Sequence, residues 1–131
     1  MASDGTRREL YDAGLRVRRE VVGPEYVARA LAATNEFTGP LQDLVTEYCW
    51  GAVWTRPGLD RRTRSLVTLG MLAALNRSHE LTTHVRAALT NGATPQEIRE
   101  ALLQTMVYAG VPAAVEAFRV AGPIIEEYTD E

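Results

Sequence analysis

The apolar residues of this chain recur at helical spacing, in segments separated by short glycine and proline signals. Apolar side chains three and four residues apart share one face of a helix, whereas a half-buried strand alternates apolar and polar residues. No stretch of this sequence shows such alternation over any length. The pattern therefore predicts an all-α fold.

Three helices are predicted in the first half of the chain. They cover about residues 6–21, 24–33 and 40–54, and Gly-Pro pairs separate them. The sequence Arg56-Pro57-Gly58 ends the third helix, PLQDLVTEYCWGAVW. In that helix, several apolar residues follow helical spacing: Leu41, Leu44, Val45, Tyr48, Cys49 and Ala52.

The fourth predicted helix carries the longest apolar run of the chain, SLVTLGMLAAL (65–75). Asp60 suits its N-cap, and the helix stops near Asn76. Because a helix that is apolar on most sides is buried, we expect it at the centre of the core. The run is too short to span a membrane, and Met1 leads into a polar segment, so we expect a cytoplasmic protein with no membrane partner.

The last three predicted helices have clear end signals. Ser78 is the expected cap of the fifth helix, and Asn91-Gly92 ends it, because glycine is favoured just after a helix. Thr94-Pro95-Gln96-Glu97 is a capping box with proline at the first helical position. That sixth helix runs to residue 108 or 109. Gly110-Val111-Pro112 then turns the chain into a last helix that reaches about residue 128.

Length and composition restrict the classes of function that the chain can have. A chain of 131 residues suits one domain spanning residues 1–131. All fourteen basic residues are arginine, so no lysine is present to form a Schiff base. The net charge of −3 and the scattered arginines give no basic face for nucleic acid. The single Cys49 excludes dithiol chemistry and is interpreted as a small buried apolar residue.

Both histidines lie in NRSHELTTH (76–84), which at first sight resembles the H-E-x-x-H helix of zinc proteases. Zinc-ligating histidines on a helix are four residues apart and share a face. His79 and His84 are five apart, which rotates them about 140° from each other. The chain has no third histidine either. We therefore expect no metal at this stretch.

Glu80 and His84 are the pair that share a face of this helix, since they are four residues apart. They lie beside the expected core stripe, which is formed by Leu81, Val85, Ala88 and Leu89. A carboxylate near an imidazole favours its protonated form, which is a usable proton donor near neutral pH. The alternative is an ordinary polar pair on a solvated helix face.

Residues 49–118 resemble the γ-carboxymuconolactone decarboxylases of the protocatechuate branch of the β-ketoadipate pathway. The most specific pieces are WGAVWTRPGL (50–59), ALNRSHELTTHVRAAL (74–89) and YAGVPAA (108–114). This family is similar to the alkylhydroperoxidase D-like superfamily, whose peroxidases carry C-x-x-C-x-x-x-H at the positions of Arg77, Glu80 and His84. Both cysteines are absent here, so thiol peroxidase chemistry is not expected from this helix.

The resemblance implies an alkylhydroperoxidase D-like domain of about six to seven helices that forms a homo-oligomer, a hexamer or trimer of dimers, with active sites near subunit interfaces. It also implies a substrate, 4-carboxymuconolactone, which is an unsaturated lactone with a ring carboxylate and an acetate arm. Loss of CO₂ from the ring pushes electrons onto the lactone carbonyl, so the reaction requires no cofactor. The protein stabilises the dienolate and protonates carbon.

Candidate site residues follow from this chemistry. His84, oriented by Glu80, is the expected general acid. Arginine suits a retained carboxylate, and His79 could help hold an anion at the helix start. The candidates for substrate binding are Arg56, Arg64, Arg77, His79, Trp54 and Tyr108, with Tyr48 and Trp50 as further aromatic walls. For the arginines the alternative is an exposed or salt-bridged side chain, and for the aromatic residues, above all Tyr48 and Trp50, it is core packing.

Three other functions remain open at this point. The chain could be a decarboxylase or isomerase of a related lactone acid, because a fold does not fix its ligand. It could instead be a non-catalytic oligomeric binding domain in which Glu80 and His84 are only a polar pair. Peroxidase activity through Cys49 alone would require a reactive thiol with a low pKa.

Overall fold

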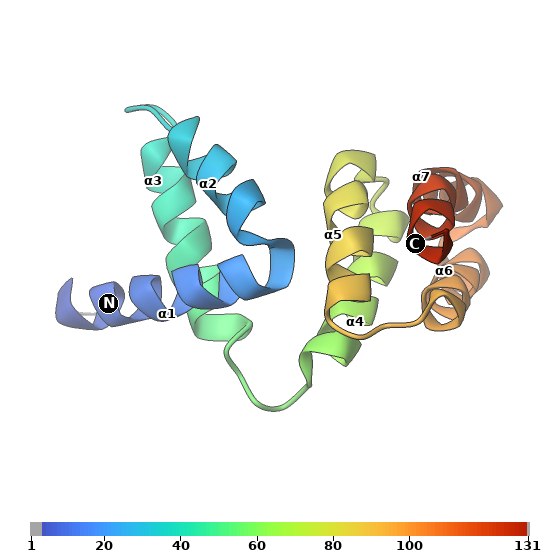
Figure 1. Ribbon diagram of the computed structural model, residues 1–131, viewed down its shortest axis with the longest axis horizontal. Helices are drawn as coiled ribbons and strands as arrows, with labels where there is room; N and C mark the ends of the chain where they lie inside the picture. Colours follow the sequence, from blue (N-terminus) through green and yellow to red (C-terminus); the bar gives the residue numbers. More distant parts are fainter. Residues whose placement is uncertain (1–3, 131) are drawn as a thin grey trace. The chain divides into compact units, whose positions relative to one another are not determined.

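The computed structural model describes residues 4–130, and these residues contain helices and no strand (Figure 1). The elements are α1 (Asp4–Val22), α2 (Pro24–Ala32), α3 (Gly39–Leu44), the π-helical segment η1 (Val45–Val53), α4 (Arg61–Ala74), α5 (Ser78–Thr90), α6 (Pro95–Ala109) and α7 (Val111–Thr129). The all-α class and the predicted number of helices are confirmed. Residues 1–3, where no apolar signal segment was expected, and residue 131 lie outside the described residues.

Contacts among these helices group them into two compact units, Met1–Leu59 and Asp60–Glu131. We call them unit 1 and unit 2 and describe each by itself. That both belong to a single domain spanning residues 1–131 stays a prediction from the sequence.

Unit 1 is built on a close crossing of α1 and η1. Gly14 and Gly51 lie at this crossing, where a Cβ atom on Gly14 would fall 2.1 Å from the carbonyl oxygen of Thr46. A Cβ atom on Gly51 would fall 2.2 Å from the carbonyl oxygen of Leu10. A Cβ atom at either position would meet backbone atoms of the other helix. Only glycine therefore allows α1 and η1 to approach each other so closely.

The third predicted helix differs from the structure in its winding. Only its first turn, α3, is α-helical, and η1 continues it with hydrogen bonds of the i to i+5 type, as from Trp54 N to Cys49 O at 3.0 Å. Thr46 and Trp50 are buried, whereas Tyr48 is 67% exposed and Cys49 is exposed. The expected burial of Cys49, and core packing as the alternative for Tyr48, are therefore wrong. Leu41 and Leu44 of the α-helical α3, which belong to the same predicted apolar stripe, are exposed as well.

Unit 2 places α4 in contact with each of α5, α6 and α7. Its core includes the fully buried Leu69, Leu81, Val85, Ile98 and Leu102. The central place of α4 is thus confirmed, but its burial on most sides is not: an outer face carries apolar side chains that are exposed in this chain, namely Val67, Met71 and Leu75.

Most of the helix ends in unit 2 follow the sequence signals. The side chain of Asp60 accepts a hydrogen bond from Thr63 N at 2.7 Å, and the capping box of Thr94 and Glu97 is present. Gly92 has a φ of 97°, as glycine after a helix does. Ser78 is not a cap but the first residue of α5, whose N-cap Arg77 makes no side-chain cap bond.

Asn76 makes the turn that leads from α4 into α5. Its φ of 58° is the only positive φ of a non-glycine residue in the described part of the chain. Asn76 N donates to Ala73 O, and Arg77 N donates to Leu72 O. These two bonds form a Schellman motif with asparagine in the left-handed position. The turn sets where α5 begins and therefore where its first-turn residues lie, including Glu80.

The crossing in unit 1 predicts that Gly51→Ala destabilises the fold strongly, by about 3 kcal/mol or more, because backbone atoms on α1 must move. Both tryptophans of the chain, Trp50 and Trp54, lie in unit 1, so tryptophan fluorescence during urea unfolding reports on it. Gly39→Ala is the matched control, since a Cβ atom there meets nothing within 4 Å. Equal stability of both variants would contradict the crossing.

Candidate active site

Helix α5 carries Glu80 and His84 on one face. The neighbouring stripe of Leu81, Val85 and Ala88 is buried in the core of unit 2, which fixes the rotation of the helix. Glu80 is exposed in the first turn of α5, and His84 is half-buried one turn further. The Nδ1 atom of His84 is enclosed. The two side chains thus lie at the margin of the core, as their spacing predicted.

Burial controls the charge of His84. It lowers the pKa of the imidazole below its ordinary value, and the negative charge of Glu80 opposes this with a smaller effect. The carboxylate alone predicts a protonated imidazole, and this prediction is wrong in sign because burial has the larger effect on the pKa. The neutral imidazole is therefore favoured near neutral pH.

The three candidate arginines occupy different environments. Arg64 is half-buried on α4, the helix that packs against α5, and its Nε atom is enclosed. Arg77 is exposed at the N-cap of α5. Arg56 is exposed in unit 1, after η1. Of the three candidates, Arg64 is therefore the one that is half-buried in unit 2, on a helix that packs against α5.

The other candidates are more scattered. His79 is exposed in the first turn of α5. Tyr108 is 85% exposed near the end of α6, where it lines an open, mostly apolar groove of about 550 Å³ between α4 and α6. Trp54 belongs to unit 1 and stacks on Trp50, with ring centroids 4.9 Å apart. Trp50 itself is buried, as core packing predicts.

The sequence did not predict a polar link between α4 and α5. Ser65, which is fully buried, accepts a hydrogen bond from the side-chain amide of Asn91 at 3.0 Å. Ser65 follows Arg64 on α4, and Asn91 ends α5. In the sequence, the available signal for this bond was that Ser65 is a polar residue at the start of an otherwise apolar run. Asn91 indicated only the end of a helix. The bond helps to fix α4, and with it Arg64, against α5.

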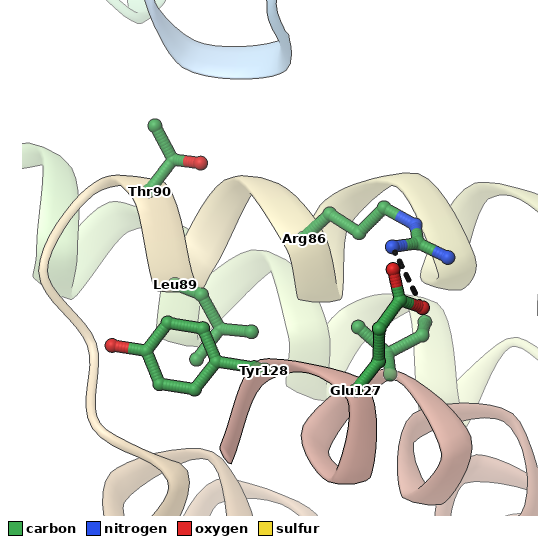
Figure 2. A pocket seen from close by; sticks show the side chains of 6 residues that line it. Arg86, Leu89, Thr90, Glu127 and Tyr128 are labelled. Atoms are coloured by element: carbon green, nitrogen blue, oxygen red, sulfur yellow. Dashed lines mark ion pairs between the residues drawn. The ribbon is translucent and has the colours of Figure 1, made fainter. Parts of the chain in front are cut away.

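A second pocket in unit 2 lies away from this face. It has a volume of about 290 Å³ and is lined by Arg86, Leu89, Thr90, Ile124, Glu127 and Tyr128. Figure 2 shows the guanidinium of Arg86 facing the carboxylate of Glu127, and their N–O distance is 3.6 Å. On α5, Arg86 is two residues from His84 and so points about 200° away from it. We do not assign this pocket to the site.

Within residues 4–130, no group of three or more His, Cys, Asp or Glu side chains is arranged to hold a metal ion. No helix in the same range is both long and apolar enough to cross a membrane.

Comparison with known proteins places this chain in a family. The model of the carboxymuconolactone decarboxylase family matches residues 39–122, which include α4 and α5. The chain therefore belongs to the carboxymuconolactone decarboxylase family. This family, together with the relatives below, makes the chain a carboxy-lyase. The all-helical architecture is consistent with the alkylhydroperoxidase D-like fold.

Two relatives match nearly the whole chain. A nitrosuccinic acid decarboxylase, npaB, from Metarhizium robertsii is 47% identical, and the match covers 100% of this chain and 94% of the relative. A 4-carboxymuconolactone decarboxylase from Acinetobacter baylyi is 44% identical, with 91% and 89% covered. An uncharacterised 15.0 kDa protein from Paracoccus denitrificans is 36% identical, with 65% of each chain covered.

The balance at His84 predicts that Glu80→Gln lowers the pKa of His84 further. The substitution removes the opposing negative charge, while the burial that lowers the pKa remains. An NMR titration of the imidazole measures the pKa, and a His79→Gln background leaves one imidazole to follow. Glu126→Gln, which neutralises an exposed acid on α7, is the control. A pKa that stays constant or rises in Glu80→Gln would contradict this balance.

Proposed function

We propose that this chain decarboxylates 4-carboxymuconolactone to the enol-lactone of β-ketoadipate, a step of the protocatechuate branch of the β-ketoadipate pathway. The observation that carries the proposal is the pairing of a half-buried imidazole with a carboxylate on α5, in a member of this family. The Acinetobacter baylyi relative, named for this reaction, supports the choice of substrate.

The proposed reaction requires little of the protein. When the ring carboxylate leaves as CO₂, the bonding electrons move through the ring double bond onto the lactone carbonyl. The resulting dienolate then takes a proton on the carbon next to that carbonyl. The protein has to hold the substrate, stabilise the negative oxygen and deliver the proton. No cofactor is needed in this proposal.

We assign the proton delivery to His84. The substrate brings two carboxylates, and their negative charge raises the pKa of a neighbouring imidazole. Substrate binding would thereby let the imidazole, which is neutral in the resting protein, take up a proton from solvent. Glu80 acts in the same direction and orients the ring. His84 then gives its proton to carbon, or donates a hydrogen bond to the developing oxyanion.

We assign the retained acetate carboxylate to Arg64, because Arg64 lies on the helix that packs against α5 and is itself half-buried. Guanidinium binds a carboxylate through two parallel hydrogen bonds. Arg56, Arg77, His79, Trp54 and Tyr108 remain proposed contributors to substrate binding.

A second candidate substrate is nitrosuccinic acid, which the relative from Metarhizium robertsii is named for. It shares two features with the lactone: a second carboxylate that is retained, and an electron acceptor that stabilises the carbanion left by CO₂. In nitrosuccinic acid the nitro group takes that role. The same imidazole and arginine would serve both substrates.

We also propose that the chain works as a homo-oligomer, a hexamer or trimer of dimers, with sites near subunit interfaces. The support is an outer apolar surface on α4 and α6, where Val67, Met71, Val107 and Tyr108 are all more than 40% exposed in the single chain. Such surfaces on soluble proteins mark contact sites. A cytoplasmic location stays a prediction from the sequence.

The function is tested by mixing the purified protein with each substrate and following CO₂ release. Wild type should turn over the lactone with higher kcat/KM than nitrosuccinic acid, and His84→Ala should lose about 10²–10⁴ in kcat because its general acid is gone. Arg64→Lys should mainly raise KM, since the bidentate contact is lost. Arg86→Gln, in the pocket of Figure 2, is the control and should keep full activity.

The outcomes separate the alternatives. A higher kcat/KM for nitrosuccinic acid would identify that acid, and not the lactone, as the better substrate. Binding of both acids without turnover by wild type would identify a binding domain. Full kcat/KM in His84→Ala would remove His84 from the mechanism.

A further inference from the structure

Arg18 is a buried cation in unit 1, outside the site on α5. It lies on α1 between the buried residues Val17 and Val21, and it is only 6% exposed. It is the one arginine in residues 4–130 that is buried to this degree. A charged side chain in such a place normally has a partner of opposite charge, because taking a cation out of water costs several kcal/mol.

The partners of Arg18 in unit 1 are neutral and use a single nitrogen. Its Nη1 donates to the side-chain oxygen of Gln42 at 3.0 Å and to the hydroxyl of Thr46 at 3.2 Å. Thr46 in turn donates to the carbonyl of Gln42 at 2.8 Å, which fixes both acceptors. Among the described residues of unit 1, no carboxylate forms an ion pair with Arg18.

The other edge of the guanidinium remains available. Among the described residues of unit 1, no acceptor takes the N–H groups of Nε and Nη2. Neither of these two nitrogens is fully enclosed, so this edge keeps an opening to solvent. Nε and Nη2 together form the planar fork that matches the two oxygens of a carboxylate.

The surroundings suit an anion. Burial lowers the pKa of Arg18, and Tyr26, Tyr11 and Cys49 oppose this with smaller effects, so these three side chains lie within electrostatic range of the guanidinium. Guanidinium nevertheless stays charged in proteins. Tyrosine hydroxyls can donate hydrogen bonds to an anion as well as accept them. Tyr11 on α1 and Tyr26 on α2 are therefore candidate hydroxyl donors to a bound carboxylate.

We propose that Arg18 forms a binding site in unit 1 for the carboxylate of a small acid, with Gln42 and Thr46 holding the plane of the guanidinium. The carboxylate has two possible sources, the substrate itself or a separate small acid. The site does not depend on which reaction unit 2 supports, because its evidence lies wholly in unit 1.

Thermal unfolding of the full chain in sodium acetate tests the site, with sodium chloride keeping the ionic strength constant. Wild type should show a saturable rise in Tm of about 3–8 °C at ten times the Kd, which we expect in the millimolar range. Arg18→Gln should abolish the rise. Arg19→Gln, which removes the exposed neighbouring arginine, should keep it.

Two further measurements keep the test decisive. If Arg18→Gln does not fold, Arg18→Lys retains the charge without the fork and should weaken acetate binding about tenfold. Calorimetric titration of wild type with acetate needs no variant and should show one site. No saturable binding by wild type, or an equal Tm rise in Arg18→Gln, would overturn the proposal.

Kinetics then separate the two sources. Competitive inhibition of decarboxylation by acetate, together with a raised KM in Arg18→Lys, would identify the substrate as the source of the carboxylate. Stabilisation by acetate without competition would identify a separate acid. Because Tm is measured without turnover, failure of the proposed reaction and failure of this site give different results.

Discussion

The packing of α5 through Leu81, Val85 and Ala88 is the constraint on which the site depends. These side chains fix the rotation of the helix, and rotation decides that Glu80 reaches water while His84 is half-buried. Burial then sets the charge of the imidazole. Because the same rotation sets the exposure of both side chains, core packing and proton chemistry are linked in this short segment.

This link suggests how a small helical decarboxylase can manage without a permanently charged acid. Desolvation keeps the imidazole neutral in the resting protein, and the negative charge of a dicarboxylate shifts the balance toward protonation. In the proposed mechanism, the substrate thus completes the site that acts on it. The same mechanism fits the substrates for which the two relatives are named. Each of these substrates retains a carboxylate and contains its own electron acceptor.

The helices and their caps could be predicted from local signals, since Asp60, the Thr94 capping box and Gly92 act through bonds within a few residues. The winding of η1 could not, because no local signal in the sequence marks it, and the close approach of α1 to this segment is a tertiary contact. The sign of the pKa shift at His84 was missed because burial is a property of the packed helices. Arg18 had a weak signal, a basic residue between the apolar Val17 and Val21.

The central claim is that the imidazole of His84 is neutral in the resting protein and gains its proton when an anionic acid binds beside it. The most direct measurement is an NMR titration of His84 with and without saturating succinate, a dicarboxylate that lacks an electron acceptor and does not react. The account predicts a higher pKa of His84 in the complex than in the free protein. An equal or lower pKa with succinate bound beside α5 would contradict it.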